Sequence, residues 1–130
     1  MKIKMSKIVV LMESETKKAI TESPMPASTG FRISRIIAKV EPEYDTFNEK
    51  RQELLKKYCK LDKDGNLKPT KEGGIQFKSE KDGKKFAEEI TPVLDEEIKL
   101  DVSKVKLSSL SKVSTLSPRD FLVCDWFIEE

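Results

Sequence analysis

The side chains that most often perform catalysis are scarce in this chain, and their spacing limits the chemistry they could support. Among 130 residues there is no histidine, the main side chain that titrates near neutral pH and the commonest metal ligand. The two cysteines, Cys59 and Cys124, are far apart and have no neighbouring thiol or imidazole, so they build no self-contained zinc site. We predict that both are free, partly buried thiols.

Ser14 and Lys17 have the Ser-x-x-Lys spacing that places an amine beside a hydroxyl on one helical turn in penicillin-binding enzymes. The Ser-Asp-Asn and Lys-Thr-Gly motifs that complete such a site occur nowhere in the chain. The phosphate-binding patterns Gly-x-x-x-x-Gly-Lys and Gly-x-Gly-x-x-Gly are missing as well. We therefore expect neither nucleophilic catalysis at Ser14 nor a nucleotide cofactor.

The segment Asp62-x-Asp64-Gly65-Asn66 resembles the start of a calcium-binding loop. Such a loop needs a glycine at its sixth position and a bidentate glutamate at its twelfth. Here Gly65 stands at the fourth position and Gly73 at the twelfth. The segment is therefore interpreted as a turn, and we predict no metal site.

Paired acids occur at Glu88-Glu89, Glu96-Glu97 and Glu129-Glu130. Neighbours on a helix point about 100° apart, so such pairs do not converge on one substrate atom, and we interpret them as solvated faces. Carboxylate pairs drawn from distant parts of the chain stay open as an alternative. On balance the sequence predicts a protein that is not an enzyme, with no catalytic residues and no cofactor.

Residues 60–85 contain eight Lys against five Asp or Glu, and Lys68, Lys71 and Phe77 lie in the middle of this excess. A basic hairpin with an aromatic residue could contact a nucleic acid backbone. The segment has no Arg and only one interleaved aromatic, and its acids would repel phosphates, so nucleic acid is a subordinate hypothesis.

Three of the nine aromatic residues, Phe121, Trp126 and Phe127, lie close together near the C-terminal end of the sequence. They follow a strong helix start, with Ser117 as N-cap and Pro118 at the first helical position. The simpler interpretation is a helix that docks into the core. The alternative is an exposed anchor for a partner, in which aromatic side chains supply most of the affinity.

The candidate binding residues are positioned by secondary-structure elements, and the spacing of the apolar residues predicts a mainly helical α+β fold. We expect a long antiparallel helical hairpin of residues 28–60 and 79–98, with a small β-hairpin over residues 64–78 at its tip. An N-terminal strand and helix over 1–23 and a C-terminal helix over 117–128 complete the prediction.

Several local signals set the expected boundaries of these elements. Ser6 is expected to cap the first helix and Ser79 the second arm of the hairpin. Pro42 lies inside the first arm, so either that helix is kinked or two helices meet near Glu41. Ile98 to Val102 and Val105 to Leu110 are typical of short extended segments.

Length and charge indicate one domain over residues 1–130, with a formal net charge of only +2. This charge does not favour a polycation or a DNA mimic. No apolar run approaches the roughly 18 residues of a membrane span, and Glu13 and Glu15 interrupt any signal-peptide pattern. We expect a cytoplasmic protein with no membrane partner.

Four segments together are similar to a family of small proteins of unknown function from tailed bacteriophages: PASTGFRISRIIAKVEPEYDTFNEKRQELLKKY, DKDGN, FAEEITPVLDEEIKLDV and LSPRDFLVCDWFIEE. The shared features are helix starts, turns and glutamate-rich helix ends. The resemblance implies a phage or prophage protein in the cytoplasm of an infected bacterial host or in the virion, and it carries over no catalytic residue.

We therefore expect a non-catalytic phage protein that acts by binding another protein. The leading prediction is a virion assembly or structural accessory protein, which would contact a phage structural protein and could form a homo-oligomer. The alternative is an inhibitor or modulator of a host protein in a defence system or in replication. A nucleic-acid-binding accessory protein is the third class.

Overall fold

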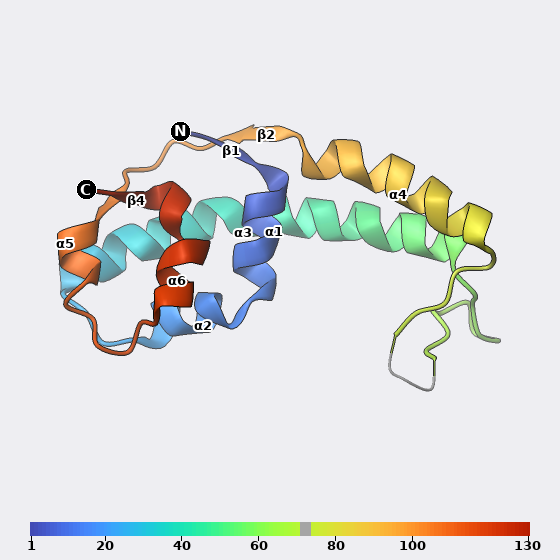
Figure 1. Cartoon of the computed structure of the whole chain (residues 1–130), viewed down its shortest axis with the longest axis horizontal. Coiled ribbons are helices and arrows are strands. Elements are labelled where there is room, and N and C mark those ends of the chain that lie inside the picture. Colours follow the sequence, from blue (N-terminus) through green and yellow to red (C-terminus); the bar gives the residue numbers. More distant parts are fainter. Residues whose placement is uncertain (71–73) are drawn as a thin grey trace. The chain divides into compact units, whose positions relative to one another are not determined.

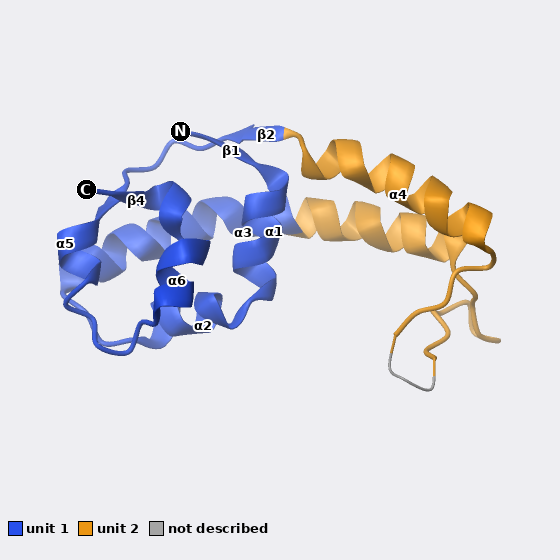
Figure 2. Cartoon of the chain, in the orientation of Figure 1, with its two compact units in different colours: residues 1–44, 97–130 blue, residues 45–96 orange. Residues whose placement is uncertain are grey.

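The computed structural model describes residues 1–70 and 74–130 and shows a mainly helical α+β protein with two small two-stranded sheets (Figure 1). The chain divides into two compact units (Figure 2). Unit 1 comprises residues 1–44 and 97–130, and unit 2 comprises residues 45–96. The division falls within the longest helix, which contributes residues to both units.

Unit 1 begins with strand β1 (Lys2–Lys4), as the alternating pattern predicts, and continues with helices α1 (Met5–Glu13) and α2 (Glu15–Glu22). We expected a single helix capped by Ser6, and this expectation was wrong. Helix α1 begins at Met5, before Ser6, and has no side-chain cap, and Ser14 interrupts the helix with an extended backbone (φ −96°, ψ 163°). The break separates two short amphipathic segments.

Helix α3 (Ala27–Tyr58) follows a linker that contains Pro24 and Pro26. It is one helix through Pro42, so the alternative of two separate helices near Glu41 is not observed. Proline lacks the N–H that would bond one turn back, and the remaining bonds of the helix continue on both sides of it.

In unit 2, helix α4 (Glu80–Leu94) runs along the C-terminal half of α3, which confirms the helical hairpin (Figure 1). Ser79 caps α4 as predicted, because its hydroxyl oxygen accepts a hydrogen bond from the Asp82 N–H at 3.2 Å. The buried apolar residues of this unit are Phe47, Leu54, Leu55, Tyr58, Cys59 and Ile90. The second arm ends at Leu94, four residues before the predicted end.

The connection between α3 and α4 contains three isolated antiparallel bridges, Cys59 with Phe77, Leu61 with Leu67 and Pro69 with Ile75. Within the described residues 59–70 and 74–79 there is no strand of the β-hairpin expected over 64–78. The predicted turn at Asp62 is present. One Asp62 carboxylate oxygen accepts the N–H groups of Asp64 and Asn66 at 2.9 and 3.0 Å, and Gly65 adopts a φ of +79°, which favours glycine.

The chain then returns to unit 1 through strand β2 (Glu97–Lys99), which pairs antiparallel with β1. Ile98 therefore belongs to a strand, as the prediction of an extended segment from Ile98 required. Strand β3 (Val105–Lys106) is followed at once by helix α5 (Leu107–Leu110), so the extended segment expected up to Leu110 was too long.

The C-terminal segment contains helix α6 (Pro118–Val123), a 3₁₀ turn η1 (Asp125–Phe127) and strand β4 (Ile128–Glu129). The predicted helix over 117–128 begins where expected but ends five residues early. Its last residues pair in parallel with β3 instead, Ile128 opposite Val105. Strand pairing satisfies backbone groups that the end of a helix would have left open.

An apolar cluster lies in the core of unit 1. It gathers side chains from α1, α2, α3, β3, α5 and the C-terminal segment: Leu11, Ile20, Ile33, Ile36, Ile37, Val105, Leu110, Cys124 and Phe127. The isoleucines recur at helical spacing along α3, so they lie on one side of this helix. None of the described helices is both long and apolar enough to cross a membrane.

Candidate functional site

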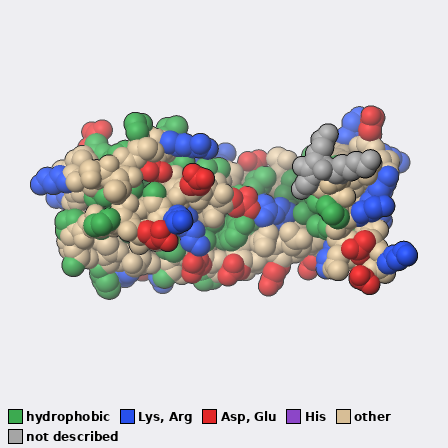
Figure 3. Space-filling view, turned by 90° about the horizontal axis from the view of Figure 1, so that it is seen from below, with side chains coloured by type: hydrophobic (Ala, Val, Ile, Leu, Met, Phe, Trp, Pro, Cys, Tyr) green, Lys and Arg blue, Asp and Glu red, His purple; other side chains and the backbone are tan. Residues whose placement is uncertain are grey.

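Unit 1 contains a polar groove between α2 and the segment that leads into α6, with a volume of about 950 Å³. We call it the α2–α6 groove. The charged residues that line it are Glu13, Glu15, Lys18, Glu22, Arg119 and Asp120. Acidic and basic side chains also lie interspersed over unit 1 on the face drawn in Figure 3.

The break at Ser14 gives this groove its first wall. The Ser14 hydroxyl donates to the Leu11 carbonyl oxygen at 3.0 Å, which satisfies an acceptor at the end of α1. Helix α2 then starts afresh and places Glu15, Lys18 and Glu22 on one side at i, i+3 and i+7 spacing. All three are exposed, so their charges are accessible from the groove.

Asp120 fixes the opposite wall. One of its carboxylate oxygens accepts the Ser117 N–H at 2.9 Å, and the Ser117 hydroxyl oxygen accepts the Asp120 N–H at 3.4 Å, which completes a capping box. The other oxygen accepts the Thr16 hydroxyl at 2.7 Å, although Thr16 lies 104 residues away. Thr16 is only 2% exposed, so this hydrogen bond ties α2 to the start of α6 from inside.

These contacts also set the protonation of Asp120. Partial burial acts to raise the pKa of its carboxyl, but hydrogen bonds from the Ser117 N–H and from the hydroxyls of Thr16 and Ser117, with the nearby Arg119 charge, outweigh burial. The pKa of Asp120 therefore lies below its ordinary value, and the carboxylate is ionised at neutral pH. A carboxylate held in this way is a structural acceptor rather than a general base.

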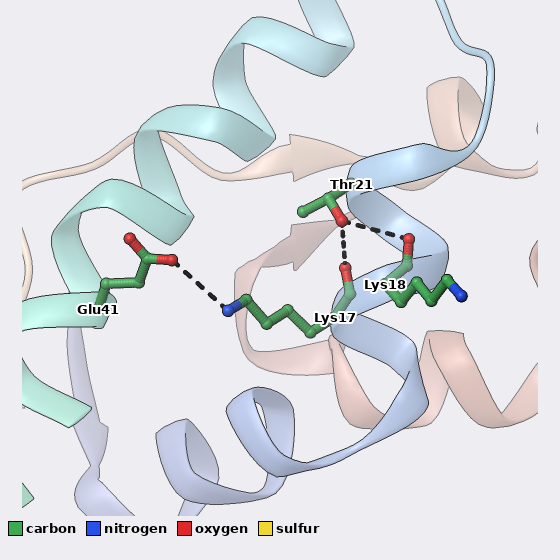
Figure 4. A network of polar contacts seen from close by, with 4 residues as sticks. All are labelled: Lys17, Lys18, Thr21 and Glu41. Atoms are coloured by element: carbon green, nitrogen blue, oxygen red, sulfur yellow. Dashed lines mark hydrogen bonds and ion pairs between the residues drawn. The ribbon is translucent and has the colours of Figure 1, made fainter. Parts of the chain in front are cut away.

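The remaining polar contacts around α2 are also made between protein groups. Thr115 donates its hydroxyl proton to the Ser23 hydroxyl oxygen at 2.6 Å. The Lys17 ammonium lies 3.5 Å from the Glu41 carboxylate, whereas Lys18 points away from Glu41 (Figure 4). With Lys17 paired to Glu41 and the Ser14 hydroxyl bonded to backbone, the Ser-x-x-Lys spacing produces no observed hydroxyl–amine contact.

The C-terminal residues predicted to bind a partner differ in exposure. Phe127 is 0% exposed and belongs to the core of unit 1, so its side chain offers no surface to a partner, which corrects its place among the candidate contacts. Trp126 packs edge-on against it at 5.0 Å between ring centroids, and Phe121 also packs on the core. The exposed apolar residue here is Leu122, which is 72% exposed.

Leu122 follows Phe121 in the sequence, and no local signal there indicates that its side chain is exposed. Helical spacing places it one turn after Arg119, which lines the α2–α6 groove. No local sequence signal marks Lys18, Glu22 and Thr115 as residues of this groove, because the contacts that assemble it join distant parts of the chain.

The lysine-rich segment in unit 2 carries the other predicted contacts. Lys68 is exposed, whereas Lys71 lies outside the described residues. Phe77 is half-buried against Phe86, with 5.5 Å between the ring centroids. Phe77 therefore serves packing within unit 2 in addition to any contact it makes with a partner.

Both cysteines are free, as predicted, and they are more fully buried than expected. Burial raises the pKa of the Cys124 thiol to about 12, with the negative charges of Asp120 and Asp125 acting in the same direction. Burial also raises the pKa of Cys59, against the opposing effect of Lys78. Neither thiol is a thiolate near neutral pH, so neither has the character of a nucleophile.

Among the paired acids of the sequence, Glu89 makes contacts within unit 2. In unit 2, the Glu89 carboxylate lies 4.0 Å from the Lys57 ammonium, and its hydrogen bond with Tyr58 raises the pKa of that phenol. Within residues 1–70 and 74–130, no group of three or more Cys, Asp and Glu side chains is placed to hold a metal ion. Comparisons with protein-family models, curated proteins and solved structures found no match.

Proposed function

We propose that this protein binds another protein without catalysing a reaction, and that the α2–α6 groove is its binding site. The observation that carries the proposal is that the groove combines internally hydrogen-bonded polar groups with exposed charged side chains. Its inner polar groups, Thr16 with Asp120 and Thr115 with Ser23, already satisfy one another, which gives a fixed floor. Charged side chains on its walls remain exposed for a partner.

The charges indicate what kind of segment would fit. Four acidic residues and two basic ones line the groove. Since Asp120 is ionised and its hydrogen bonds are internal, the accessible negative charge comes mainly from the glutamates at its walls. A segment of a protein partner that carries Lys or Arg would be attracted to this surface, and Leu122 beside it offers an apolar contact.

We also propose a phage origin, which rests only on the resemblance noted from the sequence, and with it a place in the cytoplasm of an infected bacterium or in the virion. Within this setting, virion assembly is the leading role, with a phage structural protein as partner and self-association as a further expectation. Modulation of a host protein is the alternative.

The test uses the tagged protein in lysates of infected and uninfected bacteria. Glu22→Lys reverses one charge of the groove, and lysine near the C-terminal end of α2 suits the helix dipole, so the fold should persist. Asp101→Lys reverses an exposed charge of unit 1 outside the groove and is the matched control. We expect Glu22→Lys to lose the partner and Asp101→Lys to retain it.

The lysate that yields the partner separates the two roles: a phage structural protein from infected cells supports assembly, and a bacterial protein from uninfected cells supports host modulation. If Glu22→Lys and Asp101→Lys capture the same partner equally well, the groove is not the binding site.

A nucleic acid contact through the lysine-rich segment is the third candidate, supported by exposed Lys60, Lys63, Lys68 and Lys78 in unit 2. In this hypothesis these lysines, in the connection between α3 and α4, would contact the phosphate backbone. A gel shift that weakens with salt would support it, and the absence of a shift at about 50 mM salt would exclude it.

A further inference from the structure

A second, smaller pocket in unit 1 has a different chemical character from the α2–α6 groove. It lies beside the first turn of α3, has a volume of about 240 Å³ and is lined by Ser28, Thr29, Arg32, Val105, Lys106 and Ser109. The described residues that line it include two cations and three hydroxyl groups but no acid.

The start of α3 supplies backbone donors at this pocket. The N–H of Gly30 bonds to the Pro26 carbonyl oxygen at 3.0 Å, so the N–H groups of Ala27, Ser28 and Thr29 precede the hydrogen-bond ladder of the helix. Free N–H groups and the dipole of a 32-residue helix both favour a negative charge at this end.

Thr29 provides an independent indication of a ligand. The residue is only 5% exposed, and its hydroxyl has no hydrogen-bond partner within residues 1–70 and 74–130. In the same described part of the chain, Trp126 Nε1 is the one unpartnered side-chain donor or acceptor that is wholly shielded from solvent. The Thr29 hydroxyl is therefore not wholly shielded from solvent, and Thr29 is one of the residues that line the pocket.

Arg32 is already positioned. Its Nη1 donates to the Lys104 carbonyl oxygen at 3.3 Å, which places the guanidinium between α3 and the strand that carries Lys106. The nearest acid in the sheet is Glu129, which stands opposite Lys106 in the β3–β4 register. Its charge opposes an anion without lining the pocket.

We propose that this pocket binds the phosphate group of a phosphate monoester, held by the Thr29 hydroxyl, the first N–H groups of α3 and the charges of Arg32 and Lys106. A monoester carries close to two negative charges and three acceptor oxygens at neutral pH, which suits two cations and a cluster of donors. The inference is independent of protein binding at the α2–α6 groove.

The test is a titration of the full-length protein with inorganic phosphate and, separately, with phosphoserine at constant ionic strength and near-neutral pH, followed by amide NMR shifts. We expect saturable shifts at Ser28 and Thr29. Arg32→Gln should weaken binding roughly 10- to 100-fold, as expected for the loss of a charged hydrogen bond, and Thr29→Val roughly 2- to 10-fold. Glu129→Gln should strengthen binding.

Arg35→Gln is the matched control, because Arg35 lies on the same helix with its guanidinium 6.0 Å from the Phe31 ring and does not line the pocket. It should bind phosphate as the wild type does. Equal weakening by Arg32→Gln and Arg35→Gln, or shifts at Ser28 and Thr29 that do not saturate, would overturn the proposal. Preferential binding of a DNA oligonucleotide over both phosphate probes would overturn it in favour of a phosphodiester site.

Discussion

The hydrogen bond from Thr16 to Asp120 is the contact on which the α2–α6 groove most depends, and its contribution to stability can be measured. Asp120→Ala removes two interactions at once. The capping box at the start of α6 loses its acid, which costs about 1 kcal/mol. The Thr16 hydroxyl, in a residue that is 2% exposed, loses its acceptor, which costs about 1 to 3 kcal/mol.

Thr16 lines the groove, so water can replace part of the lost hydrogen bond, and the second contribution should lie toward its lower limit. We therefore expect Asp120→Ala to lower the free energy of unfolding of unit 1 by about 2 to 3 kcal/mol. Urea unfolding followed by the fluorescence of Trp126, the single tryptophan of the chain, reports on unit 1 directly.

A double-mutant cycle separates the two interactions. In a Thr16→Val background the buried donor no longer exists, so Asp120→Ala should cost only about 1 kcal/mol, with a coupling of about 1 to 2 kcal/mol. Asp101→Ala, at an exposed acid of the same unit, should change stability by less than about 0.5 kcal/mol. The same cost of Asp120→Ala in both backgrounds would refute the assigned role of Thr16.

Three further results are expected. The pKa of Asp120 is lower in the folded protein than in the unfolded chain, where it is about 3.9. The ionised carboxylate therefore contributes its full stabilisation of the fold above this unfolded pKa, and the contribution is lost as pH falls through the lower folded pKa. Below this pH window, the urea midpoints of Asp120→Asn and the wild type should converge. The Cys124 thiol, with a pKa raised to about 12, should resist iodoacetamide at mildly alkaline pH in the native protein and react in urea, whereas rapid native alkylation would contradict its burial. Leu122→Ala should leave the urea midpoint nearly unchanged because the side chain is 72% exposed, whereas Leu110→Ala in the core should cost about 2 to 5 kcal/mol; similar losses in both variants would contradict the burial pattern.

The features that could be predicted from the sequence are those that a few adjacent residues determine. Ser117, Pro118 and Asp120 form a complete helix start within four positions, and the structure confirms it. Ser79 caps α4 through Asp82 in the same way. Such capping motifs can be recognised in a sequence because the hydrogen-bond donor and acceptor lie within one helical turn and need no tertiary partner.

The errors occurred where a distant segment decides the local structure. Ile128 and Glu129 continue the apolar and charged pattern of a helix, but they become a strand because Val105 and Lys106 are available to pair with them. Asp120 could be identified as a capping acid, yet its second partner, Thr16, is 104 residues away. A single sequence carries no local signal for either pairing, so the groove and its walls could not be located in advance.

Unit 1 is assembled from two stretches of chain with all of unit 2 between them, and this interruption imposes an order on its folding. During synthesis the first stretch emerges with Ile33, Ile36 and Ile37 before Val105 and the rest of their core partners have been made. Unit 2 is continuous in sequence, so its helices can pack before residues 97–130 of unit 1 have been synthesised.

Folding of unit 2 also makes the closure of unit 1 easier. An unstructured segment of this length would impose an entropy cost on pairing β1 with β2, and a packed helical hairpin shortens the flexible loop that has to close. Substitutions that destabilise unit 2 would therefore slow the assembly of unit 1 without touching any residue of its core. We therefore expect the stability of unit 2 to influence how fast the unit that carries both candidate binding sites is completed.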